Sequence, residues 1–112
     1  MDALSQRGSR IRVLNDLARK TFLGTRIMLT ATVAEMDEQP KARLLQAVRD
    51  YNTFDDDNDP HHEHDMGFLD FEGEKYMFKF DYYDKKMEYG SEDPGDEMKT
   101  CRVLTIMRSD EY

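Results

Sequence analysis

KYMFKFDYY, from Lys75 to Tyr83, is the stretch that decides the fold. Every second residue in it is aromatic, namely Tyr76, Phe78, Phe80 and Tyr82, while Met77, Lys79 and Asp81 alternate with them. Alternate side chains of a β-strand point to the same face of a sheet. The stretch therefore predicts a strand whose aromatic face lines the core.

The segments on either side of this strand extend it into a sheet. Gly67–Phe71 precedes it across the short Glu72-Gly73-Glu74 segment, a pattern typical of a β-hairpin in which glycine supplies the positive φ. Cys101–Arg108 predicts a final strand, because Val103, Thr105 and Met107 alternate with Leu104 and Ile106. Asp93-Pro94-Gly95, between these strands, is typical of a turn.

The first half of the chain begins with a predicted helix. Apolar residues recur at helical spacing, with Ser5 or Ser9 as the N-cap and Gly24 after the end. The expected buried stripe consists of Ile11, Leu14, Leu17, Ala18 and Phe22, and the basic residues Arg7, Arg10, Arg12, Arg19 and Lys20 lie largely outside it.

A strand and a second helix are expected next. In Arg26–Val33, residues Ile27, Leu29, Ala31 and Val33 alternate with Arg26, Met28, Thr30 and Thr32, which predicts a half-buried strand. Asp37 or Gln39, followed by Pro40, suits a helix start, and Asn52 suits its end. The apolar face of this helix is Leu44, Leu45, Val48 and Tyr51.

The order α-β-α-β-β-β predicts an α+β fold in which two helices pack on one face of a mainly antiparallel four-stranded sheet. The chain has 112 residues, enough for a single domain over residues 1–112. Its one cysteine, Cys101, excludes an internal disulfide, and the sequence contains no run of apolar residues typical of a signal peptide or membrane helix. We expect a cytoplasmic protein without a membrane partner.

Charge is distributed unevenly. Residues 1–54 carry a balance of +3, whereas residues 55–112 carry −11, and Asp55–Glu97 alone carries −12. Such a field repels nucleic acid and attracts basic surfaces. Direct nucleic-acid binding is therefore not expected, and a basic protein partner is.

All three histidines lie in Asp55–Asp65, DDDNDPHHEHD, beside six carboxylates. A calcium loop starting at Asp55 would need glycine and glutamate where Pro60 and Met66 stand, and a zinc-binding His-Glu-x-x-His motif starting at His62 also fails at Met66. Three alternatives stay open: a structural loop around an Asx-type turn at Asn58-Asp59-Pro60, a partner-contact loop, or a metal site of His62, His64 and Asp65.

Other catalytic patterns are weak. There is no Gly-x-Ser-x-Gly motif and no phosphate-binding glycine loop, and Cys101 lies in an apolar strand, where packing is the ordinary role of cysteine. A Cys101–His64 pair would require the fold to bring the two together. We therefore predict no catalytic residues and no cofactor, and favour a non-enzymatic protein.

Several short motifs, taken together, resemble a family of small proteobacterial proteins of unknown function that are common on plasmids and other mobile elements. The resemblance runs from about Ile11 to Tyr112, with Met66 in place of an aromatic residue and Thr25 in place of glycine. It rests on Leu14-Asn15-Asp16, Arg26–Thr30, Asn58-Asp59-Pro60, Glu63-His64-Asp65, Gly67, Asp81–Asp84, Gly90–Pro94, Arg102–Met107 and Glu111-Tyr112. The resemblance implies no reaction, cofactor or catalytic residue.

Charge and this resemblance together suggest an acidic inhibitor of host defence, of the anti-CRISPR or anti-restriction type, that imitates nucleic acid. Its carboxylates would occupy the basic nucleic-acid-binding surface of a host protein or complex. The predicted contact residues are Asp55, Asp56, Asp57, Asp59, Glu63, Asp65, Glu92, Asp93, Asp96 and Glu97. The alternative is a metal-binding or hydrolytic enzyme that uses the His/Asp/Glu cluster at residues 61–65. The sequence leaves open the partner, the oligomeric state and whether the acidic residues form one surface.

Overall fold

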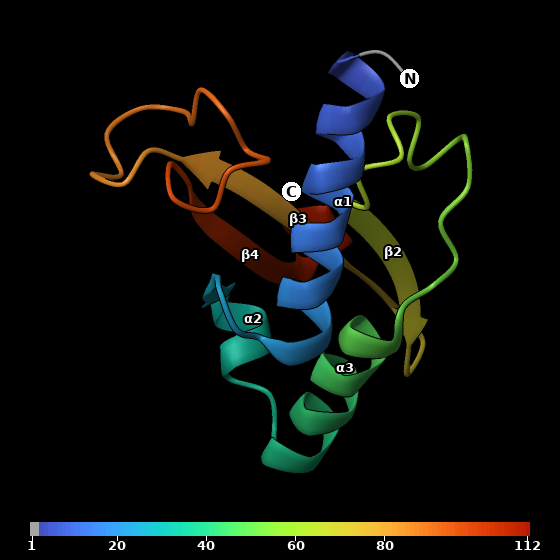
Figure 1. The fold of residues 1–112 in the computed structure, drawn as a ribbon. Coiled ribbons are helices and arrows are strands. Elements are labelled where there is room, and N and C mark those ends of the chain that lie inside the picture. Colours follow the sequence, from blue (N-terminus) through green and yellow to red (C-terminus); the bar gives the residue numbers. More distant parts are fainter. Residues whose placement is uncertain (1–2) are drawn as a thin grey trace.

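A computed structural model describes residues 3–112, with side chains from Arg7 onward. Its four strands form one mixed sheet in the order β1-β4-β3-β2, in which only the β1–β4 pair is parallel (Figure 1). The predicted α+β fold is thereby confirmed. The elements are α1 (Ala3–Thr21), β1 (Arg26–Leu29), α2 (Ala31–Ala34), α3 (Glu38–Asp50), β2 (Met66–Phe71), β3 (Glu74–Tyr83), β4 (Cys101–Arg108) and the 3-10 helix η1 (Ser109–Glu111).

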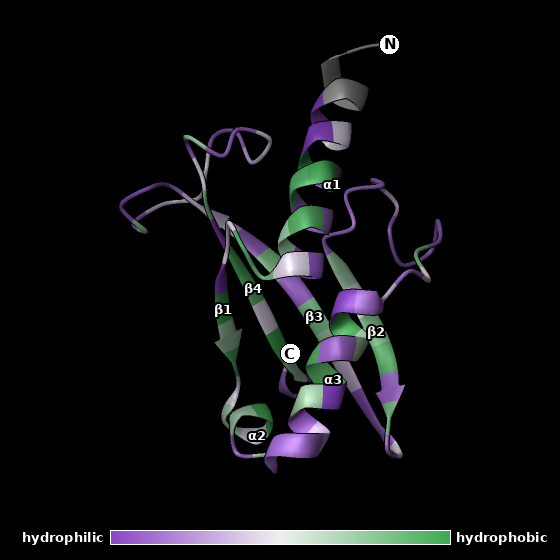
Figure 2. Ribbon diagram, turned by 60° about the horizontal axis from the view of Figure 1, so that its bottom comes forward, coloured by the Kyte–Doolittle hydropathy of each residue, from purple (hydrophilic) through white to green (hydrophobic). Residues whose placement is uncertain are grey.

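The aromatic strand has the predicted orientation. Tyr76, Phe78 and Phe80 of β3 are buried and Tyr82 is half-buried. They lie on the sheet face that α1 and α3 cover (Figures 1 and 2), together with the buried side chains of Leu44, Val48, Leu104 and Ile106. The opposite face of the sheet also contains buried side chains, because Met77 is buried beside Met107, its cross-strand partner on β4.

The predicted hairpin and second helix are confirmed. Glu72 and Gly73 both have positive φ, +51° and +81°, as a two-residue hairpin turn requires. Gly67 of β2 permits a close approach, because a Cβ there would lie 2.5 Å from Cε1 of Tyr51 and 2.6 Å from Cε1 of Phe78. α3 starts after Asp37 and buries Leu44 and Val48, as its spacing predicts.

The strand predicted for Arg26–Val33 is too long. β1 ends at Leu29, and Ala31–Ala34 form the short helix α2, in which Val33 is fully buried. The Thr30 amide donates to the carbonyl of Ile106 at 3.2 Å, and the amide of Ala34 then donates back to the carbonyl of Thr30 at 2.8 Å. The alternation of Ala31 and Val33 is therefore compatible with a helical turn and did not specify a strand.

The predicted buried stripe of α1 is wrong in two positions. Leu17 is 56% exposed, whereas Arg19, expected outside the stripe, is 2% exposed. Burial is tolerated because the Arg19 guanidinium donates to Asp16 and to the Tyr51 carbonyl and lies over the Phe54 ring. The buried face of α1 is instead Ile11, Asn15, Ala18 and Arg19.

The start of α1 also differs from the prediction. The helix begins at Ala3, so Ser5 and Ser9 both lie inside it and neither is the N-cap. Contacts with later parts of the chain accompany these early turns: Arg7 donates to the Glu92 carbonyl at 2.9 Å, and Gly8 faces the His61 carbonyl. Within residues 3–112, no helix is both long and apolar enough to cross a membrane.

Candidate interaction surface

The segment between α3 and β2, residues 51–65, is called here the first acidic loop. Its tip is folded by a carboxylate that accepts backbone hydrogen bonds. Oδ1 of Asp55 accepts from the amides of Asp57 and Asn58, each at 2.9 Å, and Oδ1 of Asn58 accepts from the Asp55 amide at 3.0 Å. These bonds satisfy backbone groups of a segment that has no regular secondary structure.

Asp59 is a structural residue of the first acidic loop. It is 2% exposed, and its Oδ1 accepts from the amides of Glu63 and His64, each at 3.1 Å. The two amides belong to a turn in which His62 and His64 have positive φ, +56° and +54°. Asp59 was predicted as a partner contact, and its burial reassigns it to holding the loop together.

His64 joins the first acidic loop to α1. Its ring stacks on Phe54, with centroids 3.8 Å apart and planes 3° apart, and Nδ1 lies 2.8 Å from Oδ1 of Asp16. Nε2 lies 3.6 Å from Oδ2 of Asp59. Both ring nitrogens therefore face carboxylates of the protein itself.

The segment between β3 and β4, residues 84–100, is called here the second acidic loop. Asn15 of α1 links it to the first. The Asn15 amide nitrogen donates to the Glu63 carbonyl at 3.0 Å and to the Tyr82 hydroxyl at 2.7 Å, while its oxygen accepts from Nε of Arg102 at 2.7 Å. The Arg102 guanidinium donates in turn to the carbonyl of Pro94.

Burial sets the electrostatics of this network. It raises the pKa of the Tyr82 hydroxyl, against the Asn15 hydrogen bond, which lowers it. Burial also lowers the pKa of the Arg102 guanidinium, opposed by the nearby Tyr82 and Glu97. Tyr82 therefore remains a neutral hydrogen-bonding group, and the Arg102 guanidinium lies over its ring.

The two acidic loops flank the N-terminal half of α1, the first on one side of the helix and the second on the other (Figure 1). His61 and Glu63 of the first loop and Pro94 of the second line one cavity of about 470 Å³ with Arg7, Gly8 and Ile11 of the helix. Nη1 of Arg12 donates to the His62 carbonyl at 3.2 Å, and Nε of Arg7 lies 3.7 Å from Asp93. Two segments separated by the β2–β3 hairpin thus share one end of the molecule.

The predicted contact residues differ in exposure. Exposed are Asp55, Asp56, Asp57, Glu92 and Glu97, whereas Glu63, Asp65, Asp93 and Asp96 are half-buried. Among residues 7–112, whose side chains the structure describes, those of Asp57, Glu92 and Glu97 form no ion pair or hydrogen bond, while Asp93 lies within 4.0 Å of both Arg7 and Arg10. The five exposed carboxylates are therefore the part of the set that a partner can reach, although Asp55 also holds the loop and Asp56 lies near His62.

The half-buried pair Glu63 and Asp65 is electrostatically unfavourable. Burial, and next the charge of Asp65, raise the pKa of Glu63. Burial is also the main cause of the raised pKa of Asp65, opposed by a backbone hydrogen bond and reinforced by Asp59. These carboxylates are held close together by the loop and the Asn15 network.

The geometry around the histidines does not assemble a metal-binding group. In the part of the chain that the structure describes, no three His, Cys, Asp or Glu side chains are placed to hold one ion. His62 is 64% exposed at its side chain and 3.7 Å from Asp56, while His64 is turned toward Asp16 and Asp59. His62, His64 and Asp65 are thus not gathered into one site, and among the described residues no interaction joins Cys101 to His64.

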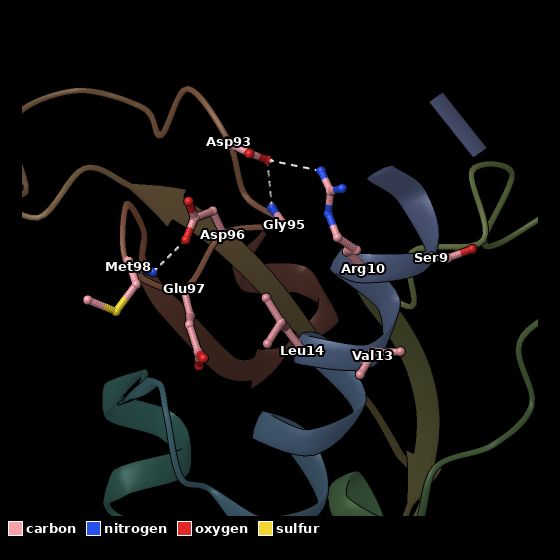
Figure 3. A pocket seen from close by; sticks show the side chains of 9 residues that line it. All are labelled: Ser9, Arg10, Val13, Leu14, Asp93, Gly95, Asp96, Glu97 and Met98. Atoms are coloured by element: carbon pink, nitrogen blue, oxygen red, sulfur yellow. Dashed lines mark hydrogen bonds and ion pairs between the residues drawn. The ribbon is translucent and has the colours of Figure 1, made fainter. Parts of the chain in front are cut away.

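One feature of the surface was missed by sequence reasoning. Between α1 and the second acidic loop lies a groove of about 680 Å³, with Leu14 directed into it and Glu97 and Met98 on the loop side (Figure 3). Val13, beside it on α1, is 62% exposed, and Met98 is 79% exposed. The sequence held one indication, because Ile11, Val13, Leu14, Leu17 and Ala18 are too many apolar residues for one face of a helix.

Comparisons with known proteins extend this description to a family. Residues 29–111 match the model of a family described as "Protein of unknown function (DUF3768)". The match begins at Leu29, the last residue of β1, and takes in strands β2 to β4, both acidic loops and η1. No curated protein and no solved structure matches the chain.

Proposed function

The chain belongs to this family of unknown function, and we propose that it is a non-enzymatic interaction protein that binds a basic, nucleic-acid-binding surface of another protein. The observation that carries the proposal is the position of the two acidic loops on either side of α1. A partner that covers this end of the molecule would meet the exposed carboxylates of both loops.

The exposed carboxylates support a basic partner. Asp55, Asp56 and Asp57 are exposed on the first acidic loop, and Glu92 and Glu97 on the second. Arg7 and Arg12 lie at the same end, but they are bonded to backbone carbonyls of these loops. A concentrated negative field speeds association with basic surfaces and repels nucleic acid, and its effect weakens as salt rises.

A role against host defence is the finer form of this proposal. The motifs of the chain resemble those of small proteobacterial proteins common on plasmids and other mobile elements, whose hosts defend themselves with nucleic-acid-binding complexes. A carboxylate surface that imitates a phosphate backbone would occupy the groove of such a complex. Anti-CRISPR or anti-restriction activity is thus the biological role that we propose.

Capture from bacterial lysate, followed by comparison of matched variants, tests the proposal. The protein is immobilised at low salt, bound proteins are eluted with rising salt, and the eluate is tested for nucleic-acid-binding proteins. The loop variant D55N/D56N/D57N removes three charges and keeps Oδ1 of residue 55 as an acceptor for the loop amides. The control E35Q/E38Q/D70N removes three exposed charges from other elements.

We expect the loop variant to bind the captured protein at least about tenfold more slowly than the wild type, with a smaller salt dependence. The control should associate at nearly the wild-type rate. The same ranking is expected for the ability of each variant to displace nucleic acid from the captured protein. The proposal fails if the eluate contains no nucleic-acid-binding protein, or if the loop variant and the control behave alike.

A further inference from the structure

The groove between α1 and the second acidic loop is lined by three apolar side chains, Val13 and Leu14 of α1 and Met98 of the loop, and Leu17 lies next to it on the helix. α1 already packs Ile11, Asn15 and Ala18 against the rest of the protein. Val13 and Leu17 lie four residues apart on another face of the helix and are 62% and 56% exposed. Apolar side chains at this spacing form a continuous strip along a helix, and such a strip is costly to leave in water.

On the other side of the groove, the second acidic loop contributes one apolar side chain and negative charge. Met98 is 79% exposed, which is uncommon for so large an apolar side chain, and its flexible thioether adapts well to a bound surface. Figure 3 shows Asp96 and Glu97 beside it, with Arg10 on the opposite side of the groove. Glu97 has no hydrogen bond or ion pair among the side chains described, those of residues 7–112, and Asp96 uses Oδ1 to accept from the Met98 amide at 2.9 Å.

The charges of the groove do not cancel. Arg10 lies 4.0 Å from Asp93, which also lies 3.7 Å from Arg7, so one carboxylate is shared by two guanidinium groups. Asp96 and Glu97 remain as a negative rim next to an apolar strip. A ligand that fits both needs apolar side chains along one line and positive charges beside them.

We infer that this groove binds a basic amphipathic helix of the partner protein. The helix would lay its apolar face on Val13, Leu14 and Met98 and direct lysine or arginine side chains to Asp96 and Glu97. A second copy of this chain is a poorer occupant, because each copy carries a net charge of −8 and the two would repel. The inference rests on the proposed function and names the part of the partner that is recognised.

The probe for the test is a labelled synthetic helix of about 14 residues, four helical turns, with leucine at positions i, i+3, i+4 and i+7 and lysine elsewhere. A scrambled peptide of the same composition, without an apolar face, is the control ligand. Binding to the full chain is measured by fluorescence anisotropy, and the contact surface by NMR shifts. The protein variants are V13S/M98S for the apolar strip and D96N/E97Q for the rim, of which D96N keeps Oδ1 as an acceptor.

We expect the amphipathic peptide to bind at least about tenfold more tightly than the scrambled one, with shifts confined to α1 and the second acidic loop. Loss of a buried apolar contact in V13S/M98S should weaken binding by about tenfold. D96N/E97Q should weaken it several-fold and reduce its salt dependence. The matched control M28S/F68S removes two exposed apolar side chains from β1 and β2 and should leave the affinity unchanged.

Equal binding of the two peptides, or equal effects of V13S/M98S and M28S/F68S, would overturn the inference. A concentration-dependent dimer that V13S/M98S abolishes would also overturn it, since the occupant would then be a second copy. If D55N/D56N/D57N weakens binding of the captured partner but V13S/M98S does not, the proposed function stands and the groove inference fails. If the peptide occupies the groove while D55N/D56N/D57N leaves partner binding unchanged, the acidic-loop proposal fails instead.

Discussion

Asn15 is the residue on which the placement of both acidic loops depends. It is fully buried in α1, yet its amide bonds reach the Glu63 carbonyl, the Tyr82 hydroxyl and Nε of Arg102. A buried polar group is tolerated only when it is hydrogen-bonded. Here the bonds of Asn15 satisfy both its own amide and buried polar groups of its partners.

Replacing Asn15 with alanine should therefore lower the free energy of unfolding by roughly 2–3 kcal/mol, because Tyr82 and the charged Arg102 each lose a buried partner. Urea denaturation measures this change. The control is Val13→Ala on the exposed face of the same helix, which should stay within about 0.5 kcal/mol of the wild type. A loss below about 1 kcal/mol for Asn15→Ala would contradict the importance of the network.

Gly67 and Gly8 allow a matched test of close packing. A Cβ at Gly67 would lie 2.5 Å from Cε1 of Tyr51, so Gly67→Ala should destabilise the protein by about 1–3 kcal/mol through overpacking. A Cβ at Gly8 would meet only the His61 carbonyl oxygen at 3.6 Å, an ordinary contact, within a helix. Gly8→Ala should therefore stabilise by about 0.5–1 kcal/mol. Thermal unfolding of both variants checks the two signs, and the same sign for both would refute the argument.

At the scale of elements, the carboxylate of Glu111 connects the end of the chain to α2. It accepts from the Arg108 amide at 2.8 Å and from the hydroxyls of Thr30 and Thr32 at 3.0 and 3.1 Å. The pKa of Glu111 is lowered from 4.5, first by the Arg108 amide and then by the two threonines. A lowered pKa means that the folded protein favours the ionised carboxylate.

The stabilisation from Glu111 is therefore complete above pH 4.5, and it is lost as the pH falls through the lower pKa of the folded state. We expect Glu111→Ala to be less stable than the wild type at pH 7, with a difference that shrinks in strongly acidic solution. Urea denaturation across a pH series measures it, with Glu35→Ala as the exposed control. A difference that stays constant with pH would show that the carboxylate charge is not responsible.

Elements with a clear periodic pattern of apolar residues were predictable from the sequence. The alternation in β3 and β4 and the apolar spacing of α3 were sufficient, because each of these elements packs the face that its sequence marks as apolar. The end of β1 was missed because alternation over Ala31 and Val33 does not exclude a helical turn. The buried face of α1 was missed because Arg19 is buried by distant partners, Phe54 and Phe78, that local spacing cannot specify.

The candidate surface was predictable only in composition. The acidic residues of both loops were visible in the sequence, but their placement beside α1 depends on bonds such as Arg7 to Glu92 that join residues far apart in the chain. Likewise, nothing in the sequence distinguished Asp59, which is buried, from Asp55, Asp56 and Asp57, which are exposed. The groove could not be predicted, because the sequence does not show which apolar residues of α1 are buried in the core and which remain exposed.

At the scale of the whole molecule, one end carries a concentration of like charge that the fold must tolerate. The first acidic loop carries six carboxylates and the second carries six with three lysines, and both loops border the N-terminal half of α1. The molecule is 43 Å long, several times the roughly 8 Å over which charges act at physiological salt. Charges at the far end, where α3 begins and the β2–β3 hairpin turns (Figure 1), therefore contribute little to this repulsion.

Screening this repulsion should stabilise the fold. We expect the melting temperature to rise by a few degrees when salt increases from about 0.01 M to about 0.15 M, because the Debye length falls from roughly 30 Å to roughly 8 Å. D55N/D56N/D57N should melt higher than the wild type at low salt and respond less to added salt, whereas the response of E35Q/E38Q/D70N should stay closer to that of the wild type. Thermal unfolding followed by circular dichroism measures all three proteins. If the two triple variants respond to salt alike, the acidic loops are too far apart to repel each other. The shared surface on which the proposed function depends would then not exist in solution.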